Sequence, residues 1–198
     1  MKSAKATVLG LSIIVMMTAA APFAFAQADH VRWDIQSVNT TTTPTTLSPG
    51  GVAFASASNP SSLTIKLTGS GTFVSPASRG TSGAVTGGGT WATFSDAVMT
   101  GSGTYVVTEL VSWQFANLQT GSFIDLIDEG TRANGNAILR IKYSDGSEGI
   151  LGVGCHGSGA PDGIVEGVIA TKHFVTYWTS HGPVPGVDAN RTIFHIER

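Results

Sequence analysis

The chain has 198 residues, and its 11 Lys and Arg against 13 Asp and Glu give a net charge of −2 near pH 7. The sequence shows no basic patch, so we expect no nucleic-acid partner. Only 12% of the residues are charged and 25 are glycine, a combination that fits an all-β protein whose strands are joined by tight turns.

The first 26 residues have the features of a secretory signal peptide. Lys2 and Lys5 precede an apolar run over Ala6–Ala21, and Ala24–Ala26 places small residues at the two positions that a signal peptidase reads. A membrane anchor is the alternative, but the run is short for about 30 Å of hydrocarbon. We expect cleavage after Ala26, export to the periplasm or beyond, and a single domain over residues 27–198 without a membrane span.

Alternation of apolar and polar residues predicts the first strands. In residues 29–38, Val31, Trp33 and Ile35 fall on one side. Residues 39–51 are rich in threonine and proline and lack periodicity, so we expect no regular structure there. Further strands are expected within 51–58 and 61–69.

A pattern of Thr-Gly-(Ser/Gly)-Gly-Thr-aromatic occurs three times, at 68–73, 86–91 and 100–105. The copies are 18 and then 14 residues apart, which is the spacing of successive short strands. Their glycines predict turns or bulges, and the threonine and aromatic residue favour a following strand. A phosphate-binding loop is not expected, because such loops end in Gly-Lys-Ser/Thr or open a helix.

The longest predicted strand covers residues 104–115, and strict alternation places Glu109 in an otherwise apolar row. This row contains Tyr105, Val107, Val111, Trp113 and Phe115. An inward carboxylate is costly unless it is paired, and its pKa can be shifted toward use as a general acid or base. The alternative is a bulge near Thr108, which would turn Glu109 to solvent.

After this strand, Phe123, Leu126 and Ile127 suggest one short helical turn, and Asn134-Gly135 suggests a turn. A strand is expected over 137–143, with Ala137, Leu139, Ile141 and Tyr143 on one side. Asp145-Gly146 predicts a two-residue hairpin turn, which would set Tyr143 opposite Glu148. In that register His156 shares the face of Leu139, Ile141 and Tyr143, and it lies either inward, in a polar cluster with Glu109 or Glu166, or at the rim of the barrel.

Cys155 is the only cysteine, which excludes a disulfide within the chain and favours a buried thiol. Its neighbour His156 points to the opposite face of the strand, so the two cannot form a dyad. Glu166 shares a side with Ile164 and Val168 and is either a second inward carboxylate or a solvated residue. Glu109, Glu166 and His156 are therefore the candidate catalytic residues.

The predicted strands end with segments at 164–171, 172–179 and 191–196. With about eight to ten short strands and almost no helix, the sequence predicts a single antiparallel β-barrel, with a two-sheet β-sandwich as the alternative. A barrel in a membrane would need eight strands of about ten residues, and these are mostly shorter.

Four aromatic residues are the expected lining of an interior ligand site: Trp91, Tyr105, Trp113 and Tyr143. No zinc-ligand spacing or cofactor motif occurs, so we expect neither a metal nor a cofactor. The favoured function is non-enzymatic binding of a small apolar or amphipathic ligand. An enzyme that uses inward Glu and His residues, such as a cofactor-free isomerase, cyclase or hydrolase, and a structural or cell-surface protein are the alternatives.

Overall fold

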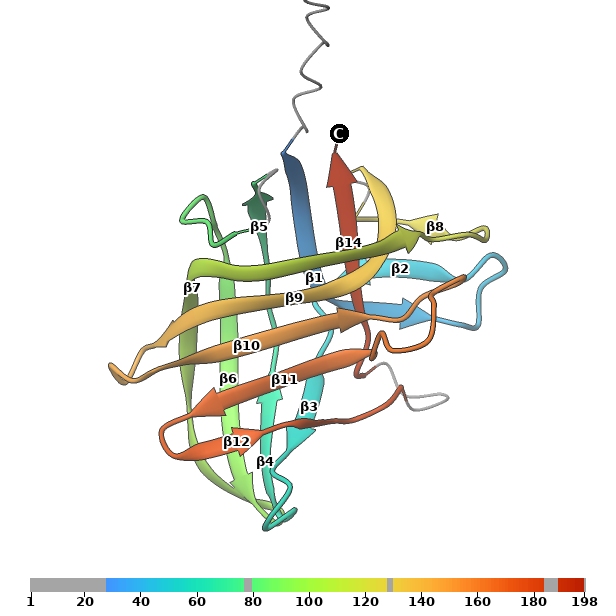
Figure 1. Ribbon diagram of the computed structural model, residues 1–198. Coiled ribbons are helices and arrows are strands. Elements are labelled where there is room, and N and C mark those ends of the chain that lie inside the picture. Colours follow the sequence, from blue (N-terminus) through green and yellow to red (C-terminus); the bar gives the residue numbers. More distant parts are fainter. Residues whose placement is uncertain (1–27, 77–79, 128–129, 184–188, 198) are drawn as a thin grey trace, which may run out of the picture.

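The computed structural model describes residues 28–76, 80–127, 130–183 and 189–197. Within these ranges the chain forms strands and connecting loops and contains no helix (Figure 1). The predicted signal peptide lies outside the described residues, so it stays a prediction.

Fourteen strands lie in the described part of the chain, more than alternation predicted. The strands that the sequence missed include β2, β8 and β13, which have four, two and two residues and are too short to show a period of two. In chain order the strands are β1 (Asp29–Asn39), β2 (Thr46–Pro49), β3 (Ala53–Ser56), β4 (Leu63–Leu67), β5 (Ser70–Ser75), β6 (Gly88–Ser95), β7 (Val98–Leu118), β8 (Ile124–Asp125), β9 (Thr131–Tyr143), β10 (Glu148–Cys155), β11 (Gly167–Lys172), β12 (Val175–Tyr177), β13 (Thr179–Ser180) and β14 (Thr192–Glu197).

Six antiparallel strands close into a barrel, which confirms the predicted architecture. Around the ring, β9 pairs with β14, β14 with β1, β1 with β5, β5 with β6, β6 with β7, and β7 with β9. Closure removes the exposed edges of these six strands. The other strands extend the sheet outside the ring: β10, β11 and β12 follow β9, whereas β4, β3 and β13 follow β6.

The two extensions face each other across a shared core. In Figure 1, β9 to β12 run across the near-vertical β5, β6 and β14, and β11 packs against β3. Ala53 and Ala55 of β3 belong to the same buried cluster as Val168 and Ala170 of β11. The inward residues predicted for β1 and β9 are confirmed as buried: Val31, Trp33, Ile35, Ala137, Leu139, Ile141 and Tyr143.

The first two glycine motifs meet where β5 and β6 close the ring. Ser70 pairs with Gly88. The hydroxyl groups of Thr68 and Thr90 form a hydrogen bond with 2.7 Å between the two Oγ1 atoms. A Cβ on Gly87 would come within 2.2 Å of the Ser70 carbonyl oxygen, and the φ of 101° at Gly87 also favours glycine. These glycines let two backbones approach closely, beyond the turn or bulge that the sequence predicted.

The third glycine motif lies inside β7, and the pairing of β6 with β7 has an irregularity at its first residue, Thr100, so a bulge is present there, as the sequence allowed. Gly103 faces Trp91 of β6 in the strand register. A Cβ on Gly103 would lie 3.0 Å from Trp91 Nε1, and one on Gly101 would lie 3.3 Å from the Trp91 ring. The motif therefore provides space for a large neighbouring side chain.

Strand β7 carries irregularities in its pairing with β9, between Val107 and Glu109 and again between Leu110 and Ser112. The bulge that the sequence allowed near Thr108 is confirmed. Strict alternation along residues 104–115 fails between the two irregularities, because each extra residue reverses the faces. After the second irregularity Trp113 and Phe115 pack against the core, as predicted. Leu110, which strict alternation would place on the face opposite the Tyr105 row, is fully buried.

The loop of the hairpin between β9 and β10 is one residue longer than the predicted two-residue turn. Tyr143 N donates to Ser147 O at 2.8 Å, and Lys142 lies opposite Glu148. The loop has three residues and ends at Gly146, with a φ of 88°, as in hairpins that combine a type I turn with a left-handed glycine. In this register Cys155 faces inward and His156 is exposed, so the face that His156 was predicted to share with Leu139, Ile141 and Tyr143 is wrong.

Three local predictions between the strands are also wrong. Residues 39–51 contain β2, which pairs with the end of β1. The helical turn expected around residues 123–127 is replaced by β8, which pairs with β2. Asn134-Gly135 lies inside β9 and forms no turn. A Cβ on Gly135 would meet Gln114 O at 2.4 Å and the Trp113 ring at 2.9 Å, so packing against β7 determines this position.

Candidate functional site

The four aromatic residues expected to line a ligand site lie in the packed core. Trp91, Tyr105 and Tyr143 are each at most 6% exposed, and Trp113 packs against the same cluster. Their polar atoms are largely used internally: Trp91 Nε1 donates to Thr104 O at 3.1 Å, and the two tyrosine hydroxyls donate to Thr68 O and Thr171 O at 2.9 and 2.8 Å. None of the four lines the hollows described below.

A buried lysine that the sequence analysis did not single out lies among these rings. Lys172 Nζ is 4.0 Å from the centre of the Trp91 ring and 4.3 Å from that of Tyr143, and the Lys172 side chain is 5% exposed. It forms an ion pair with Asp145, whose pKa this hydrogen bond holds well below its usual range. The cation–π contacts and the ion pair satisfy this charge within the protein.

Glu109 is directed away from the core by the bulge in β7. Its side chain is 32% exposed and accepts a hydrogen bond from Arg140 Nε at 2.9 Å. The Glu109 carboxylate is therefore paired at the surface, and it does not line the hollow that contains the other two candidates, Glu166 and His156.

Glu166 and His156 are brought together beside the end of β10. Glu166 accepts hydrogen bonds from His156 N at 2.6 Å and from Thr192 N at 2.7 Å. Burial raises the pKa of Glu166, and these hydrogen bonds act in the opposite direction. The carboxylate ties the loop after β10 to the start of β14.

Cys155 is buried, as expected for a free cysteine. Gln119 Nε2 donates to its Sγ at 3.1 Å, and burial raises the pKa of the thiol. A neutral thiol in this position is a poor nucleophile.

His195 and Asp125 form another pair of ionisable side chains, on the outer face of the barrel. His195 is fully buried, and its Nε2 is 2.9 Å from Asp125 Oδ2 of β8. Its Nδ1 has no hydrogen-bond partner among the described residues. His195 also lines a hollow of about 160 Å³, together with His30 and Arg32. Sequence analysis missed this pair because β8 was not predicted.

An apolar hollow forms a groove on the outer face of the sheet formed by β7, β9, β10 and β11, and it has a volume of about 440 Å³. Its bottom contains Gly152 and Gly154 of β10, which alternate along the strand and carry no side chain on this face. Gly152 lies between Ile138 of β9 and Ile169 of β11 in the strand register. The alternating glycines of β10 therefore create the hollow.

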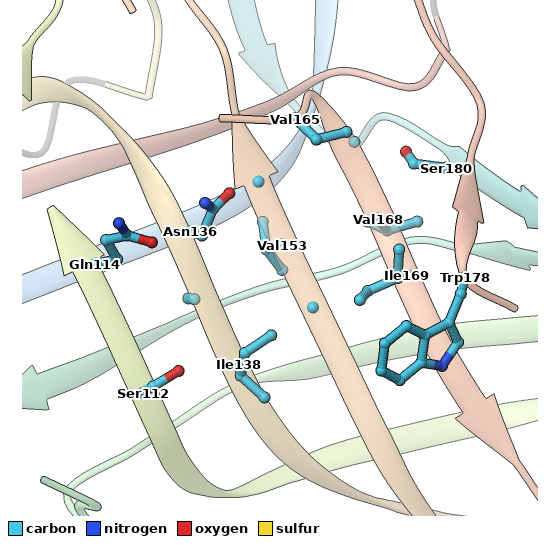
Figure 2. A pocket seen from close by; sticks show the side chains of 14 residues that line it. Ser112, Gln114, Asn136, Ile138, Val153, Val165, Val168, Ile169, Trp178 and Ser180 are labelled. Carbon is cyan, nitrogen blue, oxygen red and sulfur yellow. The ribbon is translucent and has the colours of Figure 1, made fainter. Parts of the chain in front are cut away.

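Trp178 stands at one side of this groove, and polar side chains stand at the other (Figure 2). Trp178 is 62% exposed. Ser112 and Gln114 extend from β7 and Asn136 from β9, and these three side chains form no hydrogen bond with another described residue. None of the described residues that line the groove is ionisable.

Comparisons of the chain with protein-family models, with curated proteins and with solved structures found no match. The described part of the chain contains no helix with the length and hydrophobicity needed to cross a membrane. Nor do the described residues include a group of three or more His, Cys, Asp and Glu side chains arranged to hold a metal ion.

Proposed function

We propose that the chain is exported and binds a small, neutral, amphipathic ligand in the groove beside Trp178, without chemical turnover. One observation carries the proposal: an exposed indole and an apolar floor face hydroxyl and amide side chains that have no partner among the described residues. Concave sites of this kind, mostly apolar with a few convergent polar groups, are typical of small-molecule binding.

The chemistry of the lining argues for a neutral ligand. A charged ligand would lose hydration in the groove, and the described lining offers no opposite charge to compensate. The amides of Gln114 and Asn136 each donate and accept hydrogen bonds, as a hydroxyl or amide group on a ligand requires. The apolar side of the ligand would lie against Trp178, Ile138 and Ile169.

The affinity should depend strongly on Trp178. Covering about 100 Å² of its exposed ring at about 25 cal/mol per Å² contributes about 2.5 kcal/mol, or roughly 70-fold in Kd. N-phenyl-1-naphthylamine, a neutral dye that brightens in apolar surroundings, is a suitable probe. Wild type should bind it, and Trp178→Ala should weaken binding by about 10- to 100-fold.

Phe174→Ala is the matched control, because Phe174 is fully exposed and does not line the groove. It should leave the affinity unchanged. Absence of dye binding to wild type, or equal affinity in wild type and Trp178→Ala, would reject the proposed site. Export is tested separately by the intact mass of the chain from its native cells, which should correspond to a first residue at Gln27.

A further inference from the structure

A second hollow, of about 600 Å³, lies beside the end of β10 and differs chemically from the groove. Its lining includes ionisable and amide side chains, among them Gln36, His156, Glu166 and Arg191. The lining also includes apolar side chains, among them Val38, Leu47 and Phe123. We call it the β10-end pocket.

Gln36 lines the β10-end pocket, and its side chain carries an unpaired acceptor. The residue is 6% exposed, and its Nε2 donates to Thr192 O at 3.0 Å. Because a carbonyl oxygen only accepts, this bond fixes the orientation of the amide. Gln36 Oε1 is buried without a hydrogen-bond partner among the described residues. Such an atom is costly to leave unsatisfied, so a donor in the pocket would be favoured.

Two neighbouring groups add acceptor capacity. Glu166 Oε2 accepts from His156 N at 2.6 Å, and a carboxylate oxygen can accept more than one hydrogen bond. His156 Nδ1 lies 2.7 Å from Ile164 O, which places the proton of the neutral ring on Nδ1 and leaves a lone pair on Nε2. An ammonium group, with its three donors, matches this set of acceptors.

Arg191 provides hydrogen-bond donors and a positive charge in the same pocket. Gln36 N donates to Arg191 O at 2.9 Å, which continues the antiparallel register of β1 and β14 by one residue, so the two side chains share a face. The Arg191 guanidinium forms no hydrogen bond or close ion pair with another described residue. Its fork of donors suits a carboxylate.

We propose that the β10-end pocket binds a small zwitterion with an apolar body, such as a free apolar α-amino acid. The ammonium would meet Gln36 Oε1 and Glu166, and the carboxylate would meet Arg191. The apolar side chain would lie against Val38, Leu47 and Phe123. This inference goes beyond the proposed function, because it concerns a different site and a charged ligand.

The test is calorimetric titration of the full chain with L-leucine, L-methionine and L-phenylalanine. At least one of these amino acids should bind. The N-acetyl form of that amino acid lacks the ammonium and its amide form lacks the carboxylate, and each should bind at least tenfold more weakly. No binding of the three amino acids would leave water as the occupant and overturn the proposal, as would equal binding of the capped forms.

Variants identify the contacts. Arg191→Gln should weaken binding of the free amino acid but leave binding of its amide form unchanged, a selectivity that unfolding would not produce. Gln36→Met removes the unpaired acceptor and should weaken both ligands. Gln114→Met in the groove is the matched control and should change neither affinity. Arg191→Gln with an unchanged affinity for the free amino acid would overturn the assignment.

Discussion

Two adjacent residues of β7 report on the bulge that turns Glu109 outward. Leu110 is fully buried, and Val111 is partly exposed. Strict alternation along the strand would give the reverse, with Val111 inside. Replacing each residue by alanine therefore distinguishes the bulged strand from a regular one.

The magnitudes differ enough to measure. Leu110→Ala removes the equivalent of about three buried methylenes, and with the cavity that remains it should cost about 3 kcal/mol. Val111→Ala should cost about 1 kcal/mol or less, because its methyl groups are only partly buried. For a domain of this size, about 3 kcal/mol lowers Tm by roughly 6–12 °C.

Chemical and thermal unfolding, followed by tryptophan fluorescence and circular dichroism, would provide both values. Glu109→Gln is the control, because the Glu109–Arg140 pair is exposed and should contribute less than about 1 kcal/mol. A larger loss of stability in Val111→Ala than in Leu110→Ala would refute the bulge and the outward position of Glu109.

Three further outcomes are expected. Cys155 should resist thiol labelling at pH 8 in the native protein and react after denaturation, as followed by mass spectrometry; rapid native labelling would contradict its burial. Because the ion pair with Lys172 lowers the pKa of Asp145, Asp145→Asn should be less stable than wild type at pH 7, and the difference in unfolding free energy should shrink as the pH falls below the ordinary value of 3.8; a constant difference would contradict this pairing. Gly135→Ala should lower the free energy of unfolding by about 2 kcal/mol or more, because its Cβ would meet Gln114 O, and a neutral result in urea would contradict that contact.

The fold class followed from the sequence because alternation was clear in the long strands. β1 and β9 bury the predicted residues, since one face of each packs on the shared core. The sequence did not predict the details that depend on the partner strands. The three-residue loop at Gly146 and the bulge near Thr108 each reverse the side on which the residues directly after them lie.

The sequence predicted the candidate site only in part, for the same reason. Trp91 and Tyr143 look like ligand contacts in the sequence, but the structure surrounds them with core residues and Lys172. The groove depends on Gly152 and Gly154, whose face is set by the hairpin register. Trp178 lies outside β12, in a segment where alternation does not show exposure.

The most direct test of the proposed function is an NMR titration of the full chain with the neutral dye, observed at backbone amides and indole N–H groups. The account predicts shifts at Gly152, Gly154, Asn136 and the Trp178 indole, with the indoles of Trp91 and Trp113 unchanged. Shifts confined to Trp91 and Trp113 would place the ligand inside the barrel and contradict the proposal.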